Sequence, residues 1–138
     1  LKNLIKKFAS GVKVYIVGGT GLEELIEKGD LQNRKINNII HKSLDPLLKK
    51  RVDAIALGCT HYPFLKVQIQ KIVGNKVQIV DSGGAVARQA KKILTNNKTL
   101  SIKREEDYFY TTGDKKRFKI AIKKLLKRDI KNIEKIVK

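Results

Sequence analysis

The residues best suited to chemistry lie in one short run, Gly58-Cys59-Thr60-His61-Tyr62-Pro63. Cys59 follows the apolar run Ala54–Leu57 and precedes a helical pattern, so its thiol is expected between a strand end and a helix start. The positive N-terminus of a helix favours the thiolate, the form of cysteine that acts as a nucleophile or a base. His61 is close enough to exchange a proton with the same ligand, and Thr60 offers a hydroxyl and a backbone N–H to a carboxylate. These three residues form the first candidate site.

Cys59 is the only cysteine of the chain, which excludes an internal disulfide and a multi-cysteine metal site. A lone free cysteine is most often a small buried apolar residue, and that alternative stays open. A hydrolytic Cys–His pair requires a third group that orients the histidine and an oxyanion hole, and the sequence identifies neither. The residues alone therefore leave both a nucleophile and a base open for Cys59.

A second glycine-rich stretch, Gly18–Gly21, precedes a short helical pattern. Backbone N–H groups at a helix start attract phosphate, which suggests a nucleotide-binding module. However, Glu24 stands where the third glycine of the dinucleotide motif belongs, and no Gly-Lys-Ser/Thr follows for a P-loop. A simple strand-to-helix turn is the favoured interpretation, and the nucleotide-binding module remains an alternative.

The formal net charge of +18 raises a third function class, a basic nucleic-acid-binding protein. Residues 115–138 hold eleven Lys and Arg residues against Asp129 and Glu134, so half of the excess charge lies in one C-terminal segment. Aromatic residues make up only 6% of the chain, and no alternation of aromatic and basic residues suggests a base-stacking surface. Solvated lysine-rich faces are the favoured explanation, and nucleic acid is disfavoured as a partner.

Periodicity predicts strands that alternate with helices. β-branched and apolar runs predict strands at 12–17, 54–57 and 77–80, and a short edge strand at 108–111. Apolar residues at helical spacing predict helices around 1–8, 23–27, 36–48, 63–73, 86–94 and 118–126. This order predicts an α/β fold with a mostly parallel sheet flanked by helices on both faces. Ligands of such sheets bind beyond the carboxyl ends of the strands, where loops 18–21, 58–63 and 81–84 are expected to converge.

Four segments match one known family in order and spacing. The stretch 54–65 around Cys59 resembles the second cysteine motif of glutamate racemases, and Glu27 lies in a Leu-Ile-Glu-Lys-Gly segment similar to the family's Leu-Val-Glu-x-Gly. Segments 80–83 and 110–114 also resemble the family's C-terminal part. The chain is thus identified as resembling the C-terminal portion of a glutamate racemase from about residue 12 to residue 126. An aspartate or hydantoin racemase of the same superfamily is disfavoured by the His-Tyr-Pro that follows the cysteine.

The resemblance implies a two-lobed, pseudo-symmetric enzyme that interconverts L- and D-glutamate with two opposed cysteines and without pyridoxal phosphate or metal. Cys59 would be the base or acid on one face of the α-carbon, with His61 assisting it. Thr60 and His61 would bind the substrate, and Glu27 would support the same pocket, although a solvent-exposed helix position is an equal alternative for it. The product would be D-glutamate for peptidoglycan, made in the cytoplasm. Asp81-Ser82-Gly83 is interpreted as a turn and helix cap.

Some family features are absent. The first catalytic cysteine and an Asp-Ser pair are missing, the chain starts at Leu1 without any Met, and Gly18-Gly19-Thr20 replaces an expected Cys-Pro-containing turn. We therefore expect part of a longer chain: a second lobe over 1–80, a segment over 81–128 that returns to the missing first lobe, and a basic tail over 129–138. One base cannot racemise, so this chain is expected to be inactive alone. The expected partners are glutamate and the first lobe, with a homodimer as a further candidate. No membrane span or signal peptide is predicted.

Overall fold

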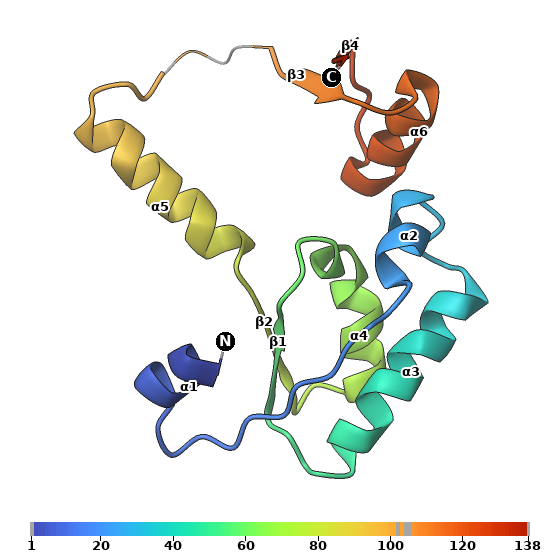
Figure 1. The fold of residues 1–138 in the computed structure, drawn as a ribbon, viewed down its shortest axis with the longest axis vertical. Coiled ribbons are helices and arrows are strands. Elements are labelled where there is room, and N and C mark those ends of the chain that lie inside the picture. Colours follow the sequence, from blue (N-terminus) through green and yellow to red (C-terminus); the bar gives the residue numbers. More distant parts are fainter. Residues whose placement is uncertain (1, 102, 104–105, 138) are drawn as a thin grey trace.

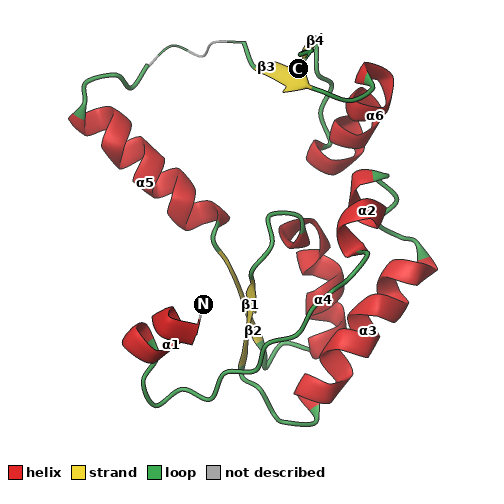
Figure 2. Cartoon of the chain, viewed as in Figure 1, coloured by secondary structure: helices red, strands yellow, loops and turns green. Residues whose placement is uncertain are grey.

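The computed structural model describes residues 2–101, 103 and 106–137. Helices and strands follow one another along most of the chain (Figures 1 and 2). The elements are α1 (Lys2–Phe8), α2 (Leu22–Glu27), α3 (Arg34–Leu48), β1 (Ala54–Leu57), the 3₁₀ turn η1 (Tyr62–Leu65), α4 (Lys66–Val73), β2 (Gln78–Asp81), α5 (Gly83–Asn96), β3 (Tyr108–Thr111), α6 (Lys115–Leu126) and β4 (Asn132–Lys135). All six predicted helices are present; residue 1 of the first lies outside the described residues.

The strands form two parallel pairs. Strand β1 pairs with β2, with Leu57 opposite Asp81 at their carboxyl ends, and β3 pairs with β4. The α/β class with parallel strands is therefore confirmed. In the segment 129–138, expected as a basic tail, residues 132–135 form β4 and Ile130 is buried at 4% exposure.

The strand predicted at 12–17 is wrong. These residues run as an extended connection between α1 and α2 and take part in neither strand pair. Val12, Val14, Ile16 and Val17 are all exposed. A β-branched run favours extended backbone, but a strand also requires a neighbour that accepts and donates its hydrogen bonds. The part of the chain that the structure describes supplies no such neighbour here.

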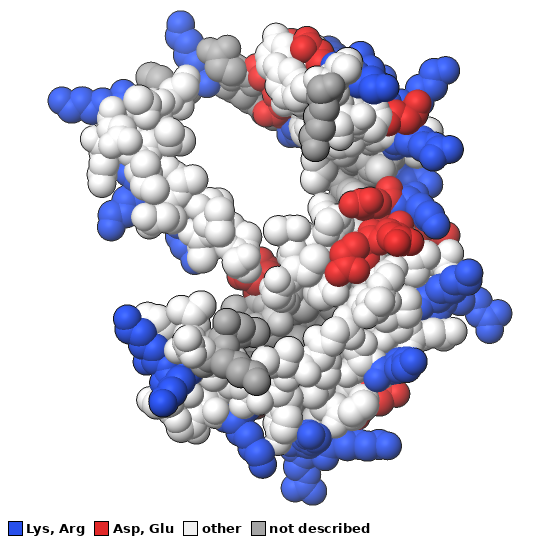
Figure 3. All heavy atoms as spheres, viewed as in Figure 1, with Lys and Arg blue, Asp and Glu red and all other residues white. Residues whose placement is uncertain are grey.

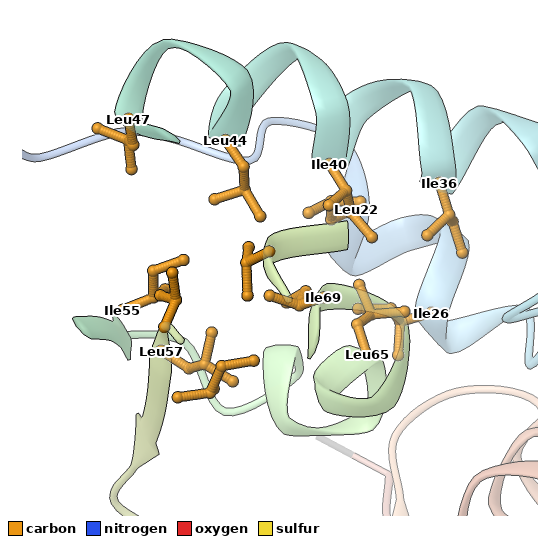
Figure 4. Packing of buried hydrophobic residues seen from close by; sticks show 13 residues of the cluster. Leu22, Ile26, Ile36, Ile40, Leu44, Leu47, Ile55, Leu57, Leu65 and Ile69 are labelled. Atoms are coloured by element: carbon orange, nitrogen blue, oxygen red, sulfur yellow. The ribbon is translucent and has the colours of Figure 1, made fainter. Parts of the chain in front are cut away.

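One apolar cluster holds the N-terminal half together. Ile55 and Leu57 point from β1 into a core formed with α2, α3 and α4, as Figure 4 shows. Its most deeply buried members are Ile26, Ile36, Ile40 and Leu65. Residues Ala54 and Ala56, on the opposite side of β1, are exposed. The described helices therefore bury one face of this sheet and leave the other accessible, rather than burying both as predicted.

Helix α5 extends away from this body (Figure 1) and has no buried residue. Its apolar residues Val86, Ile93 and Leu94 are exposed. Figure 3 shows an open space beside α5, bordered mostly by uncharged atoms, with Lys and Arg at the periphery of this view. Helix α6 returns to the body, where Leu125 packs against the core. No helix within the described ranges is long and apolar enough to cross a bilayer.

Candidate active site

Cys59 lies in the loop that leaves the carboxyl end of β1, where the sequence predicted it. The thiol is half-buried, and Sγ has two polar neighbours: Oε1 of Glu23 at 3.8 Å and Nδ1 of His61 at 3.7 Å. Both distances fit sulfur hydrogen bonds, which are longer than those between nitrogen and oxygen. The alternative of an inert, fully buried cysteine is therefore not supported.

His61 connects Cys59 to Glu27. Its Nε2 lies 3.0 Å from Oε1 of Glu27, while its Nδ1 faces the thiol. A carboxylate only accepts hydrogen bonds, so it favours the tautomer with the proton on Nε2 and leaves Nδ1 free to accept from sulfur. The side chain of Glu27 is 67% exposed, and that of His61 30%. Glu27 thus lies on an exposed helix surface and contacts His61, and its support of a substrate pocket stays a prediction.

Glu23 and Tyr62 are site residues that the sequence analysis missed. The Tyr62 hydroxyl donates to Oε1 of Glu23 over 2.9 Å, at the same oxygen that faces Cys59. Burial and the carboxylate beside it raise the pKa of Tyr62 to about 12. The backbone hydrogen bond of Glu23 and the Tyr62 hydroxyl lower the pKa of that carboxyl. One signal could have found Glu23: it precedes Glu27 by four residues, which places both on one face of α2.

The glycine-rich stretch 18–21 is the turn that brings α2 to the cysteine loop. Gly21 has φ of 86°, a left-handed conformation that glycine adopts without strain. A Cβ on Gly19 would lie 2.9 Å from the Tyr62 hydroxyl oxygen and 2.7 Å from Cδ1 of Leu22, so no larger residue fits without movement. The start of α2 therefore faces a phenol and carboxylates, which does not favour a phosphate ligand.

Thr60 and Asp81 are the other two residues that the sequence singled out. Thr60 is exposed, and no side-chain hydrogen bond of it is found among the described residues. Asp81 ends β2, and the Lys66 ammonium at 2.8 Å, together with the backbone N–H of Gly83, lowers the pKa of its carboxyl. The cap at the start of α5 is therefore made by the side chain of Asp81, while Ser82 makes no side-chain cap bond.

Parallel strands with a thiol, an imidazole and carboxylates in contact beyond a carboxyl end are typical of α/β folds whose ligand site lies at that edge of the sheet. No protein-family profile matches the chain. A glutamate racemase of Pseudomonas syringae pv. tomato is 40% identical over 111 residues, which are 80% of this chain and 40% of that protein. One from Clostridium perfringens is 38% identical over 128 residues, 91% of this chain and 49% of that protein.

Two solved structures share the fold. A glutamate racemase isoform from Bacillus anthracis matches with a TM-score of 0.82 and 27% identity, over 99% of this chain and 52% of that one. The glutamate racemase of Francisella tularensis subsp. tularensis, in complex with D-glutamate, matches with a TM-score of 0.80 and 25% identity, over 98% of this chain and 51% of that one. This chain is therefore a homologue of the glutamate racemases and corresponds to their C-terminal portion. It spans about half the length of the curated relatives it matches.

Proposed function

We propose that this chain forms part of a glutamate racemase in which Cys59 is one of two bases that invert the α-carbon of glutamate. The homology to glutamate racemases supports the reaction, and the D-glutamate complex of the Francisella tularensis relative supports the substrate. The observation that carries the proposal is the chain of contacts from Cys59 through His61 to Glu27. A thiol that exchanges its proton with a histidine can both remove and return a proton.

Each turnover moves two protons. One cysteine, as thiolate, takes the α-proton and leaves a carbanion whose charge the substrate carboxylate shares. The opposed cysteine, as thiol, gives its proton to the other face of the same carbon, which inverts the centre. Afterwards one cysteine holds an extra proton and the other lacks one, so protons must exchange with solvent. His61 is the exchange route for Cys59, and Glu27 holds the imidazole in the required tautomer.

Substrate binding is assigned to the residues beside the thiol. Thr60 follows Cys59 directly and is exposed, so its hydroxyl and backbone N–H are free to bind a carboxylate of glutamate. His61 is part-buried and sits at the same edge of the sheet. No group other than these side chains and a second cysteine is required for the proton transfers described above.

The second base must come from another lobe. Helix α5 and the outer face of β1 are exposed here, and the space beside α5 is bordered mostly by uncharged atoms (Figure 3). Such exposed apolar surface is typical of an interface. We infer that a first lobe, which carries the other cysteine, covers it, and that residues 1–138 are inactive without that lobe.

D-glutamate made in the cytoplasm would then serve peptidoglycan synthesis. Homodimerisation stays a prediction that sedimentation can test.

Reconstitution tests the proposal. The first lobe of a glutamate racemase is added to this chain, either as a separate polypeptide or as a fusion, and circular dichroism follows L-glutamate as it racemises. Activity is expected only with both parts and is expected to disappear in Cys59→Ser, because a serine hydroxyl is too weak an acid to act as a base near neutral pH. Full activity in Cys59→Ser would refute the assignment. Glu24→Gln, at an exposed side chain of α2, serves as the control that retains activity.

A further inference from the structure

Glu23 lies where two hydrogen-bond donors meet. Its Oε1 is 2.9 Å from the Tyr62 hydroxyl oxygen and 3.8 Å from Sγ of Cys59. Because the pKa of Tyr62 is raised to about 12, the phenol keeps its proton and donates throughout the neutral range. Because the pKa of Glu23 is lowered, its side chain is a carboxylate there and can only accept. The thiol of Cys59 is therefore the second donor to this oxygen.

The turn before α2 makes room for this contact. A Cβ at Gly19 would lie 2.9 Å from the Tyr62 hydroxyl oxygen, so a residue with a side chain would displace the phenol from Glu23. Gly18-Gly19-Thr20 stands here in place of the Cys-Pro-containing turn that the family resemblance implies. The glycine at position 19 thus leaves room for the hydrogen bond between Tyr62 and Glu23. Cys59 and Tyr62 both donate to Oε1 of Glu23.

The position of the proton follows from the chemistry of the groups around sulfur. A carboxyl with a lowered pKa is a far weaker base than an ordinary thiolate, so the proton stays on sulfur and points at Glu23. A negative charge 3.8 Å from Sγ also disfavours a second negative charge there. Among the described residues, the other ionisable groups on this side are Tyr62, which stays neutral, and His61 with Glu27 behind it. His61 is the group through which the thiol proton can leave.

We propose that Glu23 is a positioning residue that keeps Cys59 protonated between turnovers, with Gly19 and Tyr62 holding its carboxylate in place. The inference rests on the proposed role of Cys59 and adds a direction to it. Cys59 enters the cycle as the thiol that donates, and the opposed cysteine of the first lobe enters as the thiolate that accepts. When Cys59 must act as the base instead, its proton leaves through Nδ1 of His61.

Thiol alkylation tests this without any racemase activity. The rate of Cys59 modification by iodoacetamide is measured as a function of pH in the wild-type chain and in Glu23→Gln. The loss of one negative charge at this distance in a partly solvated site is expected to increase the rate at pH 7 about fivefold and to displace the rate–pH profile to lower pH. Glu24→Gln is the matched control: it removes the same charge from the next, exposed position of α2 and is expected to change nothing.

Tyr62→Phe distinguishes positioning from packing. It removes the hydrogen bond that holds the Glu23 carboxylate beside the thiol, so alkylation at pH 7 is expected to become faster, by less than in Glu23→Gln, with the rate–pH profile again displaced to lower pH. If both residues served only to pack the loop, both variants would react faster by the same factor at every pH with no displaced profile, which would overturn the proposal. An unchanged rate in Glu23→Gln would overturn it as well. Far-UV circular dichroism confirms folding of each variant; if Glu23→Gln is unfolded, the presence or absence of a displaced rate–pH profile in Tyr62→Phe decides. Failure of the racemase proposal would appear separately, as absent turnover after reconstitution.

Discussion

Nδ1 of His61 lies 3.7 Å from Sγ of Cys59, only two residues away in the chain, because the loop after β1 turns directly into η1. The same imidazole reaches Glu27, which is 34 residues away, at 3.0 Å through Nε2. A single side chain therefore joins the cysteine loop to α2. The contact matters because the orientation of a histidine and its tautomer decide which nitrogen can take the thiol proton.

The Glu27–His61 contact gives a first prediction. In the reconstituted enzyme, Glu27→Gln is expected to lower kcat about tenfold with little change in KM, because the amide no longer holds the proton on Nε2 by charge. The effect is smaller than for a buried catalytic carboxylate, since the Glu27 side chain is 67% exposed. Steady-state kinetics measure it, with Glu24→Gln as the control. A kcat equal to that of the wild type would leave Glu27 as a surface residue only.

The raised pKa of Tyr62 gives a second prediction. Burial and the Glu23 carboxylate raise it from 10.0 to about 12. A folded-state pKa above the unfolded one means that the stability contributed by this group is complete below about pH 10 and is lost as the pH rises through about 12. The thermal unfolding midpoint is therefore expected to fall more steeply between pH 10 and 12 in the wild type than in Tyr62→Phe. Parallel curves for the two proteins would contradict the part-buried hydrogen bond between Tyr62 and Glu23.

Local features of the sequence predicted the site well where one loop carries it. Cys59 and His61 lie in a single run between a strand and a helix, so strand-end geometry alone placed them together. Glu27 came from a motif resemblance, and its contact with His61 depends on how α2 packs. Glu23 and Tyr62 were missed because their hydrogen bond joins residues 39 positions apart through the Gly18–Gly21 turn, and no local pattern reveals such a pair.

The fold was predictable to the same extent. Helical periodicity identified all six helices, because one apolar stripe suffices to define an amphipathic helix. The segment 12–17 failed because strand formation depends on a partner rather than on β-branched residues alone. Strand β4 was missed because apolar and polar residues alternate only weakly in Asn132–Lys135, which lies in a lysine-rich segment. Its pairing partner, Tyr108–Thr111 of β3, is distant in the sequence.

A third prediction compares a buried and an exposed apolar residue in their contributions to the free energy of unfolding. Leu65 is 0% exposed in the core, so Leu65→Ala is expected to lower the free energy of unfolding by about 2–5 kcal/mol. Ile93 on α5 is 48% exposed, so Ile93→Ser is expected to leave the stability of this chain nearly unchanged. Urea denaturation measures both. The same Ile93→Ser is expected to weaken binding of the first lobe in a titration, and equal binding by both proteins would exclude α5 from that interface.

The most discriminating prediction concerns Cys59→Ser and the direction of proton transfer. In a two-base enzyme, each cysteine faces the α-hydrogen of one enantiomer only. In the reconstituted Cys59→Ser variant, exchange of the α-hydrogen with solvent deuterium is expected to persist from the enantiomer that faces the other cysteine. Exchange from the enantiomer that faces position 59 is expected to vanish, because the serine cannot remove that proton.

Proton NMR of L- and D-glutamate in deuterated water, in separate reactions, measures both rates. His61→Ala serves as the comparison: it slows proton exchange with solvent and so reduces turnover, without the same one-sided loss. Equal loss of exchange from both enantiomers in Cys59→Ser would contradict the assignment of Cys59 to one face.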